Sequence, residues 1–142
     1  MSFESDLRTY LLSKPAISAL VGTRVYPLRA PQNAAYPQLT YGIISDIEVM
    51  SLEGSSGLTD ARLHIDCWAN DAAGYSTVKS LKAAVRNALT GFSGWMGSTE
   101  VGAVLPAGDV DLYEQPESAS DTGVHHIAMD YEVSYQITKP TL

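Results

Sequence analysis

Hydrophobic and polar side chains alternate with a period of two in three parts of the chain, which predicts strands with one buried face. From Leu39 to Val49 the odd positions are mostly apolar, including Ile47. Between residues 62 and 67, apolar side chains at odd positions alternate with polar ones at even positions. The clearest alternation runs through residues 127–137, where every odd position is apolar or aromatic.

Helical spacing of apolar residues appears in three other parts of the chain. Residues 3–12 predict a short amphipathic helix, and a second short helix is expected to begin near Pro15 and to end at Gly22. The strongest helical pattern has its apolar stripe at Val78, Leu81, Val85, Ala88 and Leu89. We expect Asn70 or Asp71 to cap this helix and Gly91 to end it, which gives a length of roughly 18 residues.

The remaining segments are rich in glycine, proline and small polar residues, which is typical of loops. Residues 29–37 predict an extended loop, and residues 51–60 predict a long, flexible polar loop. Residues 93–108 are expected to form a loop or weak hairpin. Residues 110–114 predict a short strand and residues 115–123 a polar loop.

The order of these elements places the chain in the α+β class, as a single domain spanning residues 1–142. One long helix and short N-terminal helices stand among several alternating strands. That arrangement predicts an antiparallel or mixed β-sheet packed by the helices. A doubly wound parallel sheet would need more crossover helices and more uniformly apolar strands.

The chain is acidic, with a net charge of −7 from 16 acidic and 9 basic residues. Stable binding to nucleic acid or to an anionic membrane depends on clustered Lys and Arg, so both are disfavoured. No apolar run approaches the roughly 20 residues that a membrane-spanning helix needs. An acidic surface remains compatible with a channel through which DNA must pass without sticking.

Residues 51–71 contain a histidine, the single cysteine and several carboxylates, a set that would suit an active site. Strand alternation, however, places His64 and Asp66 on one face and Cys67 on the other. We therefore expect Cys67 to be a buried core residue. His64 and Asp66, with Arg62 beside them, are expected on a solvated or interface-facing side. The sequence identifies no nucleophile with an orienting partner, so we predict no catalytic residues and no enzyme activity.

The remaining candidate sites for a ligand are weak. His125 and His126 are adjacent on a strand and point to opposite faces, and no cysteine or histidine spacing of a zinc site is present. The glycines near residue 54 lack the Gly-Lys-Ser/Thr that follows in a phosphate-binding loop. The acidic residues 109–114 lack the ligand pattern of a calcium loop. We expect no metal and no cofactor, and an assembly or adaptor module rather than an enzyme.

Three stretches in the same order resemble one family of tailed-phage proteins. Residues 7–32 contain a short helix, a Pro-Ala-hydrophobic turn and then Val-Gly-x-Arg-Val-Tyr-Pro. Residues 36–41 read Tyr-Pro-Gln-Leu-Thr-Tyr, and residues 54–69 lead into the long helix. Together they resemble the tail-completion, or tail-terminator, family of long-tailed phages, prophages and gene transfer agents. The resemblance covers roughly residues 7–92.

The resemblance implies a structural virion protein that assembles into a homo-hexameric ring at the neck of the tail, after assembly in the host cytoplasm. Such a ring terminates the tail tube and joins it to the head-side connector or stopper protein. Its partners are then other copies of itself, the tail-tube protein and the connector. DNA only passes through the lumen, and no membrane is involved.

Three alternatives remain open: a head–tail joining or stopper protein, a tail-tube subunit that polymerises, and a small hydrolase that uses His64 or His125. For an assembly interface we select the loop residues, with Leu58 as the apolar tip, followed by two residues of the outward strand face. The full set is Glu53, Gly54, Ser55, Ser56, Gly57, Leu58, Arg62 and His64.

Overall fold

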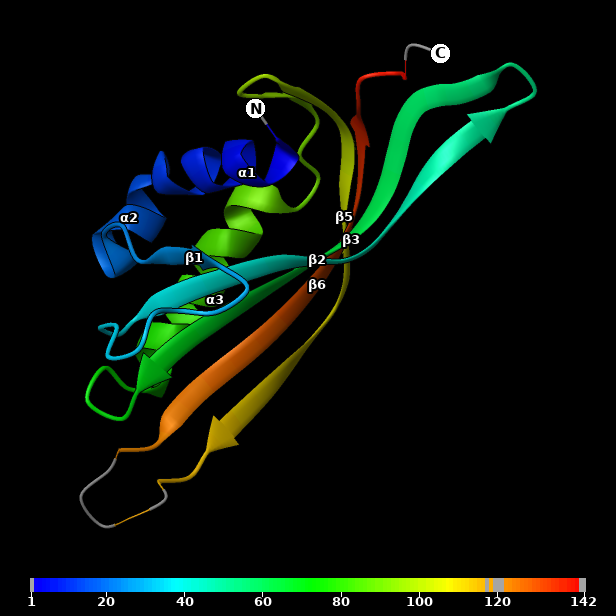
Figure 1. The fold of residues 1–142 in the computed structure, drawn as a ribbon. Helices are drawn as coiled ribbons and strands as arrows, with labels where there is room; N and C mark the ends of the chain where they lie inside the picture. The colour runs from blue at the N-terminus through cyan, green and yellow to red at the C-terminus, as the bar shows by residue number, and fades with distance from the viewer. Residues whose placement is uncertain (1, 117, 119–121, 141–142) are drawn as a thin grey trace.

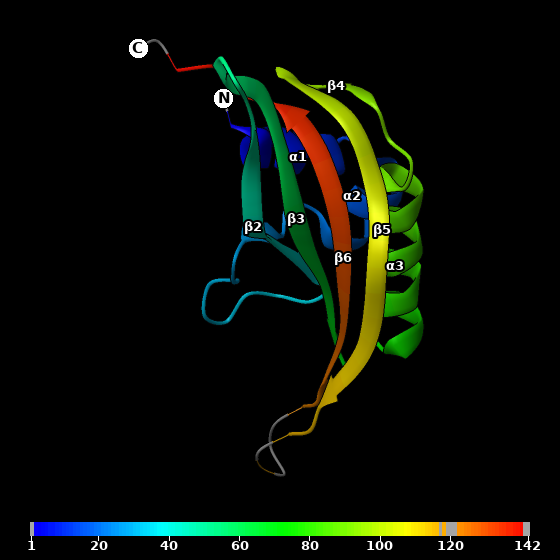
Figure 2. The ribbon, with the colours of Figure 1, turned by 90° about the vertical axis from the view of Figure 1, so that its right-hand side faces the viewer.

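Three helices cover one face of a six-stranded sheet in a computed structural model that describes residues 2–116, 118 and 122–140 (Figures 1 and 2). The helices are α1 (Phe3–Leu12), α2 (Pro15–Val21) and α3 (Tyr75–Leu89). The strands are β1 (Val25–Pro27), β2 (Gln38–Ser51), β3 (Gly54–Asn70), β4 (Gly94–Met96), β5 (Thr99–Glu114) and β6 (Val124–Gln136). Their order across the sheet is β1-β2-β3-β6-β5-β4. Only β1 and β2 are parallel, so the sheet is mixed and the predicted α+β class is confirmed.

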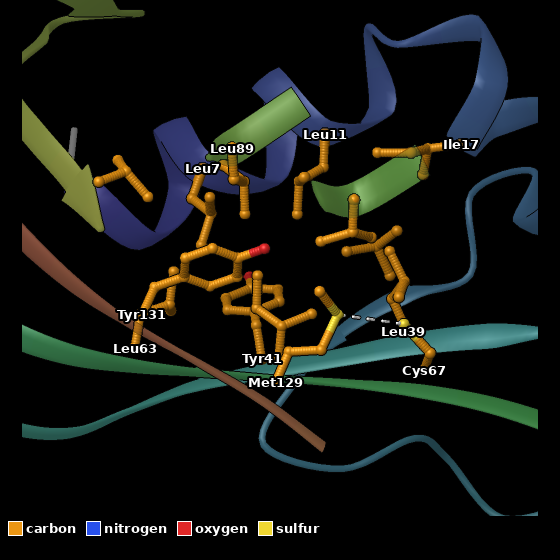
Figure 3. Packing of buried hydrophobic residues seen from close by; sticks show 14 of the residues in the cluster. Leu7, Leu11, Ile17, Leu39, Tyr41, Leu63, Cys67, Leu89, Met129 and Tyr131 are labelled. Carbon is orange, nitrogen blue, oxygen red and sulfur yellow. Dashed lines mark hydrogen bonds between the residues drawn. The ribbon is translucent and has the colours of Figure 1, made fainter. Parts of the chain in front are cut away.

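The core lies between the sheet and the helices (Figure 3). Leu7 and Leu11 of α1 and Leu89 of α3 point toward aromatic and sulfur-containing side chains of the sheet. The predicted alternation of β3 and β6 is confirmed, because their odd positions are buried beneath the helices. Burial of these apolar side chains is the main source of stability, at roughly 1.5–3 kcal/mol for each large side chain.

The start of α3 differs from the prediction. Asn70 is the last residue of β3, and α3 begins at Tyr75, directly after Gly74. The Asn70 Oδ1 atom accepts a hydrogen bond from the Ala73 backbone N–H at 3.0 Å. Asn70 therefore closes the turn between strand and helix rather than capping the helix. Among the described residues, no helix has the length and hydropathy needed to cross a bilayer.

The predicted loop 51–60 is instead part of a β-hairpin, so that prediction is wrong. Ser51 pairs with Gly54 across a two-residue turn, and β2 and β3 extend beyond the helices as a two-stranded arm (Figure 1). We define the arm as residues 44–58. The backbone at Gly57 has a φ of 79°, and the register shifts between Val49 and Met50. These glycine and bulge features bend the hairpin without ending the strands.

A β-bulge at Ile44 reverses the faces of β2. Ile43 pairs with Leu63 and Ser45 with Arg62, so Ile44 has no partner on β3. One extra residue moves every later side chain to the opposite face. Ile47, predicted to face the core, is therefore 69% exposed, and the prediction of one continuous apolar face from residue 39 to residue 49 is wrong.

Strand β5 is much longer than the predicted strand 110–114. It begins at Thr99, and only the β4–β5 pairing at residues 94–101 corresponds to the hairpin expected in residues 93–108. Pro106 and Gly108 are among the glycines and prolines from which the sequence predicts a loop in this segment. The structure accommodates them at a register irregularity between Pro106 and Asp109, where a proline does not interrupt the hydrogen-bond ladder.

The predicted polar loop 115–123 lies partly outside the described residues, because residues 117 and 119–121 are not described. At its far end, Gly123 donates its backbone N–H to Asp71 Oδ2 at 2.9 Å. This bond links the start of β6 to the turn that precedes α3.

Candidate functional site

A charged network lies on the open face of the sheet, which we define as the face that no helix covers. The His64 Nδ1 atom is 2.6 Å from Asp130 Oδ1, and its Nε2 atom is 2.8 Å from Asp66 Oδ1. Arg62 donates to Asp130 at 2.8 Å, and His126 Nε2 lies 2.5 Å from Asp66 Oδ1. The five side chains come from β3 and β6, whose register places His64 opposite Asp130.

Each carboxylate of this network contacts basic side chains: Asp130 contacts Arg62 and His64, and Asp66 contacts His64 and His126. Partial burial acts to raise the pKa of Asp130, but hydrogen bonds from Arg62 and His64 outweigh burial and hold the pKa below its ordinary value. The protonated imidazolium of His64 can donate to both Asp66 and Asp130, whereas a neutral ring has only one N–H donor. The network links β3 to β6 through contacts between charged and polar side chains.

We predict that His64→Ala lowers the free energy of unfolding by about 1–2 kcal/mol, because Asp66 and Asp130 would then lose the imidazole ring that lies between them. Because the network is partly exposed, this decrease in the free energy of unfolding should be smaller than for a fully buried ion pair. His64→Gln keeps one donor and should lose about half as much. Urea denaturation at pH 7 measures both variants, and equal stability of His64→Ala and the unmodified chain would contradict a stabilising linkage.

Cys67 lies on the opposite side of the sheet from this network. Its side chain is fully buried, and its Sγ atom is 3.9 Å from Met129 Sδ (Figure 3). Burial raises the pKa of the Cys67 thiol well above its ordinary value. The predicted separation of His64 and Cys67 is thus confirmed, and the two side chains do not converge. Among the described residues, no group of three or more His, Cys, Asp and Glu side chains is arranged to hold a metal ion.

The predicted interface residues divide between the arm and this network. Glu53 lies exposed in the turn at the arm tip, and the three residues that follow it are half-buried in β3. Gly57 is buried under the side chain of Lys139. Leu58 pairs with Val49 and Gln136, so the prediction that Leu58 is the apolar tip is wrong. The tip residue is Leu52, whose side chain is fully exposed at 108%.

The arm carries four large apolar side chains that the single chain leaves uncovered. They are Ile44, Ile47, Met50 and Leu52, exposed by 58%, 69%, 64% and 108%. Sequence alternation missed this group because the bulge at Ile44 moved Ile47 from the predicted core face to the open face. The adjacent pair Ile43-Ile44 was the one available signal, since two neighbouring isoleucines in a regular strand cannot both face the core.

Two long strand edges are also left unpaired within the described part of the chain. Strand β1 covers β2 only at residues 39–41, and β4 covers β5 only at residues 99–101. The outer edges of residues 43–51 and 105–114 therefore have no neighbouring strand among the described residues. Long edges with apolar side chains favour pairing with another chain. The arm and the two edges form the candidate assembly surface.

Comparisons with known proteins identify the family and similar folds. The family model described as "Tail completion protein gp17" matches residues 5–136. A chain in the virion of a native gene transfer agent (GTA) particle is 21% identical and superposes with a TM-score of 0.72, covering 95% of each chain. Another solved chain, 12% identical over 99% of both chains, gives a TM-score of 0.47. No curated protein sequence matches this chain.

The family match extends over both strands of the arm, the long helix and the final strand of the sheet. Since it spans nearly the whole chain, it concerns the entire domain rather than a shared fragment. The chain belongs to the tail completion protein gp17 family.

Proposed function

We propose that this chain forms a ring that terminates the tail tube of a phage or gene transfer agent and joins the tube to the head-side connector. Family membership identifies a structural protein of a phage-type tail. The proposal adds three points to family membership: the ring is closed, it lies at the neck, and it assembles in the host cytoplasm. In such a particle the tail-tube protein and the connector or stopper would contact opposite sides of the ring.

The arm is the observation that carries the proposal. It projects past the helices and carries the four exposed apolar side chains described above (Figure 1). Exposed apolar groups on a projecting hairpin are stabilised when another molecule covers them. Contact between the arm and a different surface of the neighbouring subunit would be head-to-tail. Such contacts close into a ring when the rotation between neighbours permits it.

The charge of the chain suits a ring through which DNA passes. Acidic residues exceed basic ones by 16 to 9, so the average surface repels phosphate groups. On the open face Asp60, Glu114 and Glu132 add carboxylates beyond those of the charged network, and Arg62 is the only Lys or Arg in strands β2, β3, β5 and β6. A face of this kind would let DNA slide without stable binding.

The proposal predicts that Ile47→Asp weakens self-association at least tenfold while leaving the fold intact. Ile47 is 69% exposed, so its replacement should change the free energy of unfolding by no more than about 0.5 kcal/mol. Ala72→Asp places the same charge on an exposed turn before α3 and serves as the matched control. Light scattering across a concentration series measures the association.

The same measurement separates the ring from its alternatives. A closed oligomer of defined mass that binds the end of purified tail tubes supports a terminator. Open filaments favour a tube subunit, and binding to the connector without binding to tubes favours a head–tail joining or stopper protein. A chain that stays monomeric even in the presence of tubes and connector would contradict the assembly role.

A further inference from the structure

A hollow of about 200 Å³ lies at the end of β2 opposite the arm tip. The segment between β1 and β2 borders it on one side, and the open face of the sheet forms its floor. Leu28, Arg29 and Tyr36 come from the connecting segment, and Gln38 and Trp68 come from paired positions on β2 and β3. We call this group of residues the β1–β2 hollow.

Leu28 stands at the rim of the hollow in an unfavourable conformation. Its φ is 63°, in the left-handed region that non-glycine residues seldom adopt, and its side chain is 78% exposed. Backbone strain of this kind clusters at functional sites such as ligand clamps and switch regions. A contact that covers Leu28 would recover the apolar burial that the single chain does not provide.

Gln38, one of the residues that line the hollow, carries an unpaired acceptor. Its side chain is only 5% exposed, and its Oε1 atom accepts no hydrogen bond from any described residue. An unpaired buried oxygen costs about 1–3 kcal/mol, so native structures seldom retain one without a reason. A donor that reaches the Gln38 amide on assembly would satisfy this oxygen.

The floor and rim of the hollow supply a rigid apolar surface and a free cation. The Trp68 ring stacks on His126 at 3.8 Å between centroids, and its Nε1–H donates to Thr40 at 2.9 Å. These contacts fix the indole in one orientation. The exposed Arg29 forms no ion pair with any described residue. The β1–β2 hollow therefore offers apolar contact beside one positive charge.

The arm tip has the complementary chemistry. Leu52 is fully exposed, and the neighbouring Glu53 forms no ion pair among the described residues. Both residues lie in the turn between β2 and β3, where the chain projects farthest from the helices (Figure 1). A leucine beside a carboxylate matches the apolar floor and the single arginine of the hollow.

A chain cannot insert its own tip into its own hollow. Gln38 begins β2 and Ser51 ends it, and at about 3.3 Å per residue the strand holds the two sites roughly 40 Å apart. Contact between tip and hollow is therefore possible only between two copies. It joins different surfaces of neighbouring copies, as a head-to-tail ring requires.

We propose that the arm tip of one subunit inserts Leu52 into the β1–β2 hollow of the next subunit and pairs Glu53 with Arg29 there. This contact rests on the proposed ring and specifies which surfaces join its subunits. The Leu52 side chain covers Leu28 and Trp68 of the neighbour.

Charge reversal tests the ion pair. Glu53→Arg and Arg29→Glu should each weaken self-association at least tenfold, and the double variant should recover most of the loss because the pair is restored with opposite polarity. Both substitutions are at exposed positions, and circular dichroism and thermal melting verify the fold of all three variants. Two single variants that assemble like the unmodified chain, or a double variant with no recovery, would overturn the contact.

Cross-linking tests the position of the tip. Leu52→Cys combined with Leu28→Cys should give disulfide-linked oligomers on a non-reducing gel, up to the full ring, after mild oxidation. Leu52→Cys combined with Trp95→Cys, which puts the second thiol on exposed β4, should not. The native Cys67 is buried and stays unreactive. Rings that form without this cross-link would overturn the contact but not the proposed ring. A chain that never forms rings would overturn both the proposed ring and the contact.

Discussion

Cys67 of the folded chain will react with a thiol reagent such as Ellman's at least a thousandfold more slowly than the same cysteine in the unfolded chain. Its side chain is fully buried, so the reagent reaches it only when the chain opens. Burial, and then the negative charge of Asp66, raise the pKa of the Cys67 thiol, although Lys82 slightly opposes them. The reactive thiolate is therefore scarce even during a partial opening. For domains of ordinary stability the unfolded fraction is about 10⁻³ or less.

Absorbance at pH 8 follows the reaction, with the chain in concentrated urea as the reference for the unfolded rate. A reaction rate that rises with urea in parallel with global unfolding would identify Cys67 as a structural residue. Rapid reaction of the native chain, inhibited when His64 is replaced by Ala, would instead reveal an activated thiol. That result would favour the hydrolase hypothesis over the assembly role.

Asp6→Ala should lower the free energy of unfolding by about 3 kcal/mol, roughly a hundredfold in the folding equilibrium. Asp6 lies on α1 and is only 2% exposed. It accepts hydrogen bonds from the hydroxyls of Thr99 at 2.6 Å and Ser98 at 2.9 Å. Alanine would leave the buried Thr99 hydroxyl without its acceptor and would detach α1 from the β4–β5 turn. Glu4→Ala, an exposed substitution in the first turn of the same helix, is the matched control.

The contribution of Asp6 should depend on pH in a defined direction. The hydrogen bond from Thr99 lowers the pKa of Asp6; burial opposes it, and hydrogen bonds from Ser98 lower it further. Because the pKa is lower in the folded chain than its ordinary value of 3.8, the charged group stabilises the fold fully above about pH 5. This stabilisation is lost as pH falls through the folded pKa.

Denaturation series from pH 7 to pH 2.5 on the unmodified chain and Asp6→Asn measure this dependence. The difference in the free energy of unfolding between the unmodified chain and Asp6→Asn should be constant above pH 5 and should decrease as the pH falls. Asparagine keeps the shape of the side chain and one hydrogen-bond acceptor. At pH 7, Asp6→Asn should therefore lower the free energy of unfolding by about half as much as Asp6→Ala. A difference that stays the same at pH 2.5 would show that charge contributes nothing at this position.

The assembly surface could be predicted only in part from the sequence. Glu53, which the sequence predicts as an interface residue, lies exposed in the turn, whereas the glycines and serines that follow it are half-buried or buried. The apolar tip was assigned to Leu58, whereas the structure places Leu52 there. The error arose because a loop and the end of a hairpin have nearly the same composition. Which residue lies in the turn depends on the pairing of Ser51 with Gly54, and no local pattern specifies that register.

The hollow and the charged network were not visible in the sequence because their members are far apart along the chain. Asp130 joins Arg62 and His64 only because β6 pairs with β3, which places residues nearly 70 positions apart side by side. Gln38 and Trp68 meet for the same reason across β2 and β3. Spacing along a chain carries no information about such contacts unless the strand order is already known.

The sequence by itself determined the α+β class, the buried faces of β3 and β6, and the burial of Cys67. These features follow from side-chain periodicity, because the pleat of a strand separates odd from even positions wherever the strand is regular. Only the tertiary structure determined that β2 and β3 form an arm, that the faces of β2 are reversed beyond Ile44, and how long β5 is. Those features depend on bulges and on pairing between distant strands. One unpaired residue there reverses all later side chains without changing the local sequence pattern.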